Sequence, residues 1–417
     1  MAKRKLELGA KEIRQLKKRL PALAETVEHF LLLDSHQHRH SYGRFDWLCG
    51  WGSKRVLTAS ENSLRRLQKI WQEEESWFLG YLNFNLKNEL ETLHSQHRDP
   101  FALPHLAFFE PAHVLYQDEE GLWLESDHSF EEIEKSLPSE PQATGALPEF
   151  EAQISRNEYL KRVEHLMAEL RYGNIYEINF CQEFNAIGEI DPVGQYQRLS
   201  PRHQAPFGAL LRWGDFHSLC FSPERYLRKK GRELISQPIK GTAPRGRDQA
   251  ADQLEKEQLY QSEKERAENV MIVDLVRNDL SRVARPGSVS VPELFGIYSF
   301  EAVHQMISTV RAELEDEFDF SAALAASWPM GSMTGAPKIS ALELIDHYES
   351  FNRGLYSGAI GYLSPEGDFD FNVVIRSLLY DARQKLSSVR VGSAITVYCD
   401  PAKEYEECQL KADKLIR

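Results

Sequence analysis

The sequence predicts an α+β protein with substantial antiparallel sheet. Stretches with the apolar pattern of strands, several of them next to glycine turns, outnumber the stretches with helical spacing. Both kinds occur in each half of the chain, so helices and strands are not confined to separate parts. With 417 residues, 42% of them hydrophobic, the chain is long enough for one large core or for two subdomains.

The first predicted segment, residues 1–140, combines helical and strand-like pieces. Residues 1–21 are basic and lack an apolar core, which predicts a surface helix rather than a signal peptide. Residues 29–48 contain strand-like runs. Residues 135–150 hold three prolines and a glycine, which predicts an exposed connection to a second region over 151–417.

The second region predicts a helix, a strand, a hairpin and another helix in that order. Residues 154–173 carry apolar residues at helical spacing and end at a glycine, and residues 174–187 predict a strand. Residues 217–239 predict two strands around a turn at 230–232. A long charged helix is expected over 253–280.

The chain closes with two strand-like stretches and a helix. The strands are predicted within residues 368–382 and 387–399. Residues 401–417 predict a helix, with Pro401 near its first turn.

The composition argues against several classes of protein. A formal net charge of −13 argues against a broad nucleic-acid-binding surface. The five cysteines are scattered without a CxxC pair, which is not typical of a disulfide framework or a zinc site and favours a reducing compartment. No apolar run approaches the roughly 18 residues needed to cross a membrane. We therefore expect a cytoplasmic protein with neither nucleic-acid nor membrane partners.

Lys240 and Glu224 form the first candidate site. They are equidistant from position 232, so a hairpin turning there would place them nearly opposite, with Cβ atoms about 5 Å apart. Taken alone, such a pair is more often an ordinary cross-strand ion pair. However, Gly241 follows at once and suits close approach of the backbone to a ligand. A nucleophilic lysine would need burial or a nearby positive charge, such as a divalent metal, to release its proton.

Two pairs of glutamates are consistent with such a metal. Glu265 and Glu268 are three residues apart, as are Glu404 and Glu407, so each pair shares one face of a predicted helix. Two carboxylates from separate helices, completed by water and substrate oxygens, suit Mg²⁺. On spacing alone, solvated helix faces are the commoner explanation in a chain with 63 acidic residues.

Ordered motifs in these stretches resemble the chorismate-utilising enzymes. They include SPERYL (222–227), PIKGTAPRG (238–246), GSMTGAPKISALELID (331–346) and YSGAIGYLS (356–364), and the resemblance runs from about residue 30 to the C-terminus. It implies chorismate as the substrate and a fold like that of anthranilate synthase component I. In that fold, large antiparallel sheets pack as a sandwich with outer helices, and the two predicted segments are interlaced in one globular unit.

The lysine at position 240 resembles the branch of this family that aminates chorismate on the path to 4-aminobenzoate and folate, whereas other branches carry alanine there. The resemblance implies that Lys240 attacks C2 while the C4 hydroxyl leaves with a proton from Glu224. Ammonia would then attack C4 and expel the lysine. We expect 4-amino-4-deoxychorismate as the product, because no lyase domain follows Arg417.

The resemblance also implies roles for the rest of the pocket. Glu268 and Glu407 match the family's Mg²⁺ ligands, with Glu265 and Glu404 completing the site. Arg376 matches the residue that grips the second carboxylate of the substrate, because a guanidinium can bind a carboxylate bidentately. The other expected substrate-binding residues are Tyr356, Lys411, Gly392, Thr334, His304, Gly241 and Thr242.

Four positions depart from the family pattern. Glu177 stands where water-adding members have lysine and ammonia users usually have glutamine, so it argues against hydroxylating chemistry. Ser393 and Ala394 interrupt a run that is usually richer in glycine, and Met330 stands where glycine is commoner.

The resemblance also implies two partners. Component I enzymes of the family often hold tryptophan between their N-terminal and central segments, and Ser35, Pro206 and Phe207 resemble that site. No cysteine lies in a GxCxG context, so a separate glutamine amidotransferase subunit would supply the ammonia.

Two alternative functions remain open. One is an anthranilate-forming lyase with the same fold and Mg²⁺, which Lys240 argues against. The other is a non-catalytic relative that binds tryptophan or a partner, which would be expected to lack the lysine or the carboxylates.

Overall fold

The computed structural model describes residues 1–38, 42–143, 145–301 and 303–417. Its strands join in one network of hydrogen bonds, and every strand pairing in these described ranges is antiparallel. The predicted α+β class with large antiparallel sheet is therefore confirmed.

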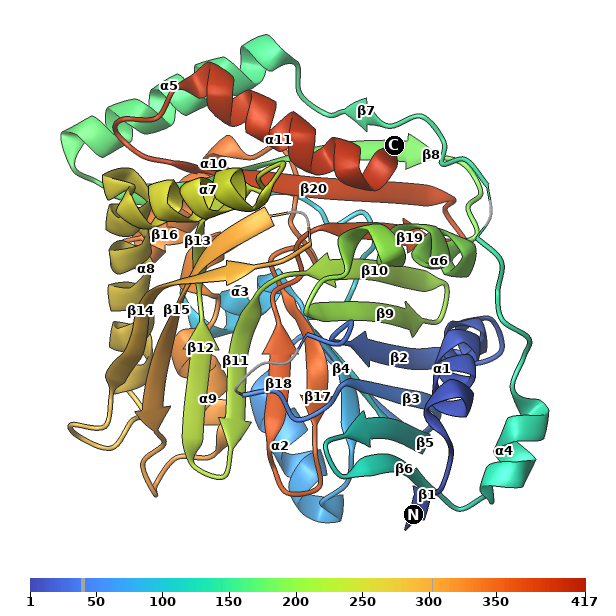
Figure 1. Ribbon diagram of the computed structural model, residues 1–417. Coiled ribbons are helices and arrows are strands. Elements are labelled where there is room, and N and C mark those ends of the chain that lie inside the picture. Colours follow the sequence, from blue (N-terminus) through green and yellow to red (C-terminus); the bar gives the residue numbers. More distant parts are fainter. Residues whose placement is uncertain (39–41, 144, 302) are drawn as a thin grey trace.

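The network has two arms that meet at one long strand. In spatial order, the first arm contains β8 (Glu177–Ile187), β20 (Leu386–Ile395), β19 (Ser377–Asp381), β10 (Phe216–Ser222), β9 (Phe207–Trp213), β2 (His29–Asp34), β3 (Trp47–Ala59) and β5 (Leu106–Asp118). From β5 the second arm continues through β4 (Phe78–Leu82), β17 (Ala359–Leu363), β18 (Phe369–Asn372), β11 (Arg225–Lys230), β12 (Glu233–Gln237), β15 (Val303–Glu313) and β14 (Ser290–Ser299). In Figure 1 the strands of the first arm run across the view, and those of the second run up it.

Five further strands extend these arms. They are β13 (Ile239–Pro244) on β15, β7 (Glu151–Ala152) and β16 (Gly335–Ala336) on β8, β6 (Gly121–Ser126) on β5, and β1 (Ala2–Leu6) on β6. Because β2 pairs with β9 and β4 pairs with β17, strands from either side of the linker at 135–150 lie in the same network. The predicted division into 1–140 and 151–417 stays a prediction.

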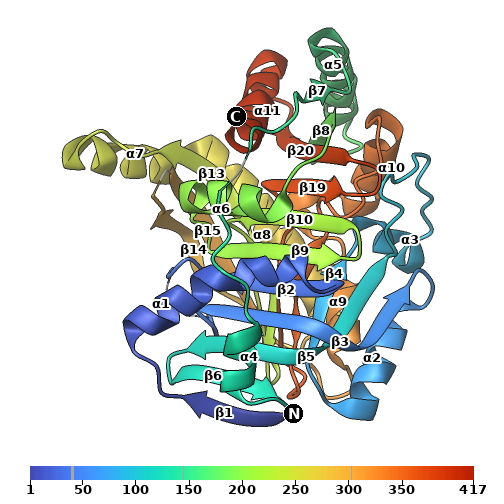
Figure 2. The ribbon, with the colours of Figure 1, turned by 90° about the vertical axis from the view of Figure 1, so that its right-hand side faces the viewer.

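Helices cover the outside of this network. They are α1 (Ala10–Arg19), α2 (Ser63–Glu74), α3 (Lys87–Leu90), α4 (Phe130–Ser136), α5 (Arg156–Tyr172), α6 (Pro192–His203), α7 (Gln249–Gln261), α8 (Glu263–Ser281), α9 (Phe320–Ser327), α10 (Lys338–Tyr348) and α11 (Pro401–Ile416), with short 3₁₀ turns η1 (Leu20–Glu25), η2 (Phe84–Leu86) and η3 (Gly331–Met333). Figure 2 shows α5 and α11 side by side above β8 and β20. None of the helices in the described part of the chain has a stretch both long and apolar enough to cross a bilayer.

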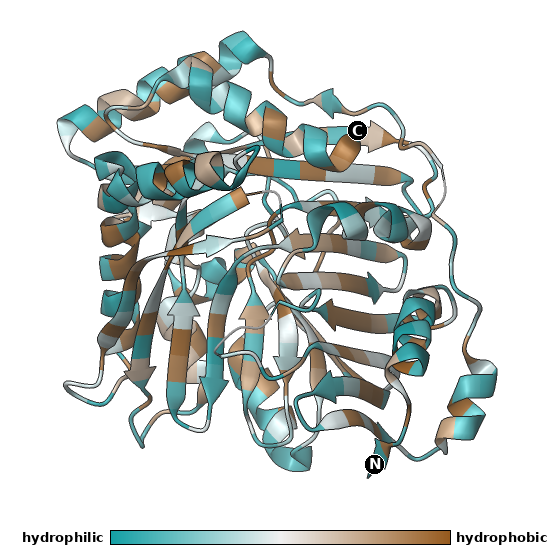
Figure 3. Ribbon diagram, in the orientation of Figure 1, coloured by the Kyte–Doolittle hydropathy of each residue, from teal (hydrophilic) through white to brown (hydrophobic). Residues whose placement is uncertain are grey.

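Two large apolar clusters hold the fold together. One joins the arms to each other, since it contains Leu211 and Cys220 from the first arm together with Leu227 and Phe371 from the second. The other lies beneath α5 and α11 and packs them on β8 and β20. Figure 3 shows hydrophobic residues along the strands and mixed colouring on α7 and α8. Removal of this apolar area from water is the main driving force for the assembly.

Several predicted elements are confirmed. The helix over 154–173 is α5, which ends at Gly173 with φ 91°, a left-handed value that glycine adopts without strain. The strand over 174–187 contains β8, the turn at 230–232 joins β11 to β12, and α11 forms the closing helix. The described part of 29–48 contains β2 and the start of β3, whereas residues 39–41 lie outside the described ranges.

Three predicted elements are wrong in detail. Residues 2–6 form an edge strand instead of helix, because β6 offers them a partner. The single helix expected over 253–280 is two helices, since Ser262 ends α7 and caps α8 by accepting a hydrogen bond from Glu265 N. The strand expected over 368–382 is likewise two strands, β18 and β19, separated by a bend that carries Arg376 with φ 52°.

One buried ion pair ties several of these elements together. Arg353 and Glu349 are each only 1% exposed at the side chain and lie 2.6 Å apart. The Arg353 guanidinium also donates to the carbonyls of Asn179 in β8 and Met333 in η3, at 2.7 and 2.6 Å. Glu349 in turn accepts a hydrogen bond from Cys181 N at 2.9 Å. The pair therefore joins β8, η3 and the segment after α10.

We expect Arg353→Met to lower the free energy of unfolding by about 3–5 kcal/mol, because it leaves the Glu349 carboxylate buried without a counter-charge. Urea denaturation at neutral pH measures the change. Arg277→Met is the matched control, since Arg277 and its partner Asp274 are half or more exposed. It should cost less than about 1 kcal/mol. Equal losses in the two variants would contradict a special role for the buried pair.

Candidate active site

One large polar cavity gathers most of the predicted site. It has a volume of about 430 Å³ and lies where the free ends of the two arms approach α8 and α11. The predicted residues that line it are Glu224, Lys240, Gly241, Thr242, Glu265, Glu268, Tyr356, Arg376, Gly392, Glu404, Glu407 and Lys411. They come from segments up to 187 residues apart in sequence, from Glu224 to Lys411, so the fold itself brings them together.

Lys240 lies on β13 with only 10% of its side chain exposed. Its Nζ donates a short hydrogen bond to Glu177 Oε1 of β8, and Glu177 is 1% exposed. Burial alone would lower the pKa of Lys240, but the carboxylates of Glu177, Glu268 and Glu224 overcome that effect and raise the pKa above its usual value. The lysine is therefore held as an ammonium in this form of the protein.

The expected face-to-face pairing of Glu224 with Lys240 is wrong in register. A bulge in β11 shifts the pairing so that Arg225 faces Gln237, and Pro238 separates β12 from β13. Lys240 consequently pairs with Glu177, although Glu224 remains close enough for the two charges to interact. Both side chains still line the same cavity.

Glu224 has the properties of a proton donor near neutral pH. It is 5% exposed, and burial raises its pKa to about 7, although the Ser332 hydroxyl and the Lys240 charge partly oppose the rise. A carboxyl group with such a pKa is partly protonated at pH 7 and can act as a general acid.

The four predicted metal-site glutamates face the same cavity from two helices. Glu265 and Glu268 come from the first turns of α8, and Glu404 and Glu407 from α11. Burial raises the pKa of Glu268 to about 7, and burial also raises the pKa of Glu265 and of Glu404. So many acidic groups in one cavity are costly without a cation to neutralise them.

A lysine bridges these two acidic helices. Lys264 Nζ lies 3.8 Å from Glu268 Oε1 and 3.9 Å from Glu404 Oε1. Glu268 Oε1 is buried and accepts no hydrogen bond from the described residues. These hard oxygen donors suit Mg²⁺, but no three His, Cys, Asp or Glu side chains of the described ranges converge as a preformed metal centre. A metal ion would therefore also need oxygens from water or substrate.

Arg376 gives the cavity a cation of a different kind. It is half-buried in the bend between β18 and β19, and its φ of 52° is unusual for a residue other than glycine. Burial lowers its pKa, and no hydrogen bond or ion pair of its guanidinium is found within the described residues. An unpaired, half-buried guanidinium that lines a cavity is suited to binding an anion.

Lys411 and Gly392 lie in contact on the cavity wall. Lys411 Nζ donates to Gly392 O at 2.8 Å and lies 2.5 Å from Glu407 Oε1. Burial would raise the pKa of Glu407, but the Lys411 ammonium holds it below the usual value. A Cβ atom at Gly392 would lie 2.5 Å from Asn179 Oδ1 and 2.6 Å from Cys181 Sγ, so only glycine fits there.

Gly241 provides a second close approach. Its φ of 90° favours glycine, and a Cβ atom there would lie 3.1 Å from Glu265 Oε2. Of the departures from the family pattern, Ser393 donates a short hydrogen bond to Glu404 Oε2, and Ala394 lines the cavity.

His304 and Thr334 do not line this cavity. His304 is fully buried, with Nε2 2.9 Å from Asp252 Oδ1 and Nδ1 3.0 Å from Ser299 Oγ. Thr334 is also fully buried, and its hydroxyl donates to Met330 O at 3.2 Å. The structure therefore gives both residues structural partners outside the cavity wall.

The sequence analysis did not single out several cavity residues. They are Asn179, Lys264, Gln305, Ser332, Arg390 and Lys414. Glu177, which contacts Lys240, was noted only as a departure from the family pattern. Two of them carried usable signals: Asn179 is two residues after Glu177 on the same face of β8, and Lys264 is four before Glu268 on the same helix.

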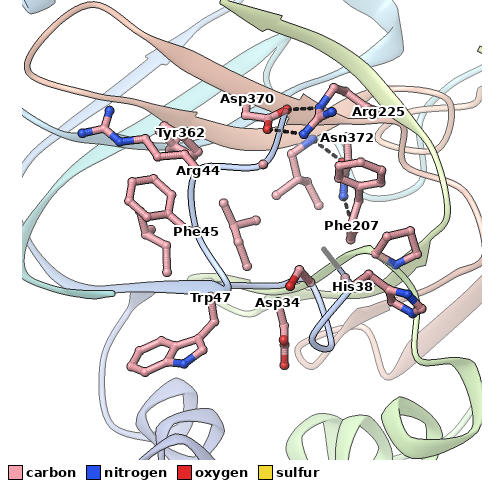
Figure 4. A pocket seen from close by; sticks show the side chains of 17 residues that line it. Asp34, His38, Arg44, Phe45, Trp47, Phe207, Arg225, Tyr362, Asp370 and Asn372 are labelled. Atoms are coloured by element: carbon pink, nitrogen blue, oxygen red, sulfur yellow. Dashed lines mark hydrogen bonds and ion pairs between the residues drawn. The ribbon is translucent and has the colours of Figure 1, made fainter. Parts of the chain in front are cut away.

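A second pocket lies between the two arms and contains all three residues of the candidate tryptophan site. Ser35, Pro206 and Phe207 line it together with Phe45, Trp47 and Tyr362. Figure 4 shows aromatic rings beside charged groups here, including Asp370, which is bound to Arg225 through two hydrogen bonds of 2.9 and 3.0 Å. The buried Ser35 hydroxyl has no hydrogen-bond partner in the described part of the chain.

Comparison with known proteins begins with a family model. A model described as chorismate binding enzyme matches residues 22–417. Among curated proteins, aminodeoxychorismate synthase component 1 of Escherichia coli strain K12 is 32% identical over 420 residues, covering 93% of this chain and 92% of that protein. The Salmonella typhimurium protein of the same name is 36% identical over 344 residues, covering 81% and 75%. The chain spans only 28% of aminodeoxychorismate synthase, chloroplastic, of Arabidopsis thaliana, at 43% identity.

Solved structures show the same fold. Anthranilate synthase component I from Streptococcus pneumoniae TIGR4 superposes with a TM-score of 0.79 at 25% identity, covering 91% of this chain and 94% of that chain. The menaquinone-specific isochorismate synthase of Escherichia coli superposes with a TM-score of 0.78 at 17% identity, covering 100% of this chain and 94% of that one.

Proposed function

The chain belongs to the family of chorismate binding enzymes, and on that premise we propose that it converts chorismate and ammonia to 4-amino-4-deoxychorismate. The observation that carries this proposal is the lysine amine of Lys240 inside the cavity, next to a carboxyl group whose pKa is about 7. An amine nucleophile and a protonated acid are the two groups that displacement of a hydroxyl by a covalent route requires. The names of the similar curated proteins support the same activity.

The proposed reaction has two displacement steps. In the first, the neutral Lys240 amine forms a bond to C2 of chorismate, the ring double bond shifts, and the C4 hydroxyl leaves as water with a proton from Glu224. In the second, ammonia forms a bond to C4, the double bond shifts back, and Lys240 leaves C2 as a neutral amine. The proton that the new C4 ammonium releases restores Glu224. Atoms and charge balance, with one water produced for each ammonia consumed.

We propose that opposite ends of the cavity hold the two substrate carboxylates. Arg376 would bind the enolpyruvyl carboxylate with its unpaired guanidinium, with Tyr356 beside it and Lys411 contributing positive charge. Glu268 and Glu407 would hold Mg²⁺, with Glu265 and Glu404 completing the acidic site. Bound there, Mg²⁺ would neutralise the ring carboxylate and make the ring more electrophilic.

The ammonia would come from a separate glutamine amidotransferase subunit. All five cysteines, Cys49, Cys181, Cys220, Cys399 and Cys408, are buried, and burial raises the pKa of every one. None is therefore suited to the thiolate chemistry of glutamine hydrolysis. Five free thiols also favour the reducing cytoplasm as the compartment.

We further propose that the second pocket binds tryptophan. Its aromatic side chains would pack on an indole ring, and its paired charges and the free Ser35 hydroxyl would meet the amino and carboxylate groups. The anthranilate-forming alternative is not favoured. Lysine at position 240 resembles the aminating branch, and the similar curated proteins are named aminodeoxychorismate synthase component 1.

The proposed covalent intermediate should be detectable by its mass. Protein incubated with chorismate and Mg²⁺ without ammonia should gain the mass of chorismate less one water, mapped by peptide analysis to Lys240. Lys240→Ala should form no adduct. Lys87 is the internal control, since burial lowers its pKa to about 8 and it does not line the cavity. An equal mass gain on Lys87 would mean indiscriminate alkylation and would sink the proposal.

The rate of adduct formation should depend on pH. Because Glu224 must be protonated to act as the acid and its pKa is about 7, adduct formation should fall about tenfold per pH unit above pH 7. Following adduct formation without ammonia keeps the titration of ammonium out of the profile. Glu224→Gln should slow the step by about 10²–10⁴-fold and remove this decline. A decline that persisted in Glu224→Gln would assign it to another group.

The second pocket should bind free tryptophan. Calorimetric titration with tryptophan should give saturable binding, and Ser35→Leu should abolish it by filling the pocket. Ser281→Leu, the same change on an exposed position, should leave binding intact. If the unaltered protein took up no tryptophan at millimolar concentration, the pocket would need another occupant.

A further inference from the structure

The ion pair between Glu177 and Lys240 is not used by the reaction described above, yet it involves the reacting nitrogen. Glu177 contacts Lys240 Nζ through Oε1. Its other oxygen, Oε2, is buried and accepts no hydrogen bond from the described residues. A carboxylate with one oxygen on the amine and the other unpaired has a free position for a proton.

Glu177 is held rigidly in this place. It is the first residue of β8 and pairs with Ala336 of β16. Gly335 packs so closely against it that a Cβ atom there would lie 2.2 Å from Glu177 O. The carboxylate therefore approaches Lys240 from a fixed backbone, as a group that exchanges a proton with one particular atom must.

A nucleophilic lysine must lose a proton before it attacks. The surrounding carboxylates hold Lys240 as an ammonium, so a nearby acceptor has to take that proton when substrate binds. Glu177 is the group in hydrogen-bond contact with Nζ. In so buried a place, transfer within the pair removes two charges at once, which offsets much of its cost.

On the basis of the proposed function, we propose that Glu177 is the catalytic base that takes a proton from the Lys240 ammonium. The transfer converts the ion pair into a neutral amine and a neutral carboxylic acid. The amine then bonds to C2 as the C4 hydroxyl departs. When ammonia expels Lys240 as a neutral amine, Glu177 returns the proton, so the pair ends as it began.

This assignment separates the two carboxyl groups near Lys240 by task. Glu224 donates to the departing hydroxyl, and Glu177 serves only the lysine. The charged groups that face the Lys240 ammonium are Glu177 from β8, Glu268 from α8 and Glu224 from the segment between β10 and β11, with Glu265 of α8 nearby. Of these, Glu177 alone makes a hydrogen bond to Nζ among the residues that the structure describes.

The test compares adduct formation by the unaltered protein and Glu177→Gln, with saturating chorismate and Mg²⁺, no ammonia, and quenching for intact-mass analysis between pH 6 and 8.5. In the unaltered protein, Lys240 can pass its proton to Glu177. The fraction of protein that can present a neutral Lys240 amine should therefore not change with pH. Glu177→Gln must rely on the fraction of Lys240 that is neutral, which rises tenfold per pH unit below its pKa. Any contribution of Glu224 cancels in the ratio of the two rates.

We expect Glu177→Gln to be slower by about 10²–10⁴-fold at pH 6, with the ratio shrinking about tenfold per pH unit. Glu177→Asp should retain the profile of the unaltered protein at a lower rate, because it keeps a carboxylate. Glu164→Gln, on an exposed face of α5, should change neither rate nor profile. Circular dichroism and chorismate binding establish that each variant is folded.

Two results would overturn the inference while leaving the proposed function intact. A rate ratio independent of pH would mean that Glu177 only positions the lysine, and equal rates would mean that it does neither. If the unaltered protein formed no adduct on Lys240 at any pH, the proposed function itself would fail, and the inference with it. The first two results leave the covalent reaction standing, so the two failures are distinguishable.

Discussion

The geometry of the cavity depends on one buried guanidinium, that of Arg353. Arginine can meet this demand because its planar group carries five donors in fixed directions, whereas lysine has a single point charge. Here those donors reach Glu349 and the carbonyls of Asn179 and Met333. Arg390 of β20 adds a hydrogen bond of 2.6 Å to the Arg353 carbonyl. Arg353 thus joins three parts of the cavity wall: β8, which carries Glu177, β20, which carries Gly392, and η3, which precedes Thr334. These contacts fix the distances between the three parts.

Within that fixed frame Arg376 stays free of a carboxylate partner among the described residues, whereas Lys240, Lys264 and Lys411 each lie against a glutamate. The glutamates reach the cavity from α8 and α11, and Arg376 reaches it from the bend between β18 and β19. Lys240 comes from β13, and Glu224 from the segment between β10 and β11. If Arg376 paired with a glutamate as well, its guanidinium would not be available to an anionic ligand. The proposed dicarboxylate substrate and its cation would satisfy both kinds of group, which would offset the cost of burying so many charges.

Much of the fold and most of the site follow from local sequence patterns. The errors concern strand register, contacts between residues distant in sequence, and the direction of side chains. Helix α5 was predictable because its apolar spacing and terminal glycine are local signals, and Pro401 in the first turn is a local signal for α11. The register of Lys240 was not, because a bulge and Pro238 break the symmetry that a simple hairpin assumes. Its partner Glu177 lies 63 residues earlier on a strand of the other arm, so no spacing rule could join them. His304 and Thr334 sit within family motifs, but motif position does not tell which way a side chain points.

The two cavities meet at a single peptide bond, which constrains both. Glu224 faces the large cavity, and the next residue, Arg225, faces the pocket between the arms. Arg225 is 1% exposed, is fixed by Asp370 through two hydrogen bonds and by Gln237 through a third, and stacks on Phe207 at 4.8 Å. Because consecutive residues of an extended chain point in opposite directions, the contacts that hold Arg225 also fix the backbone of Glu224. The position of the proposed acid is therefore set from the pocket behind it, by residues that never touch the large cavity.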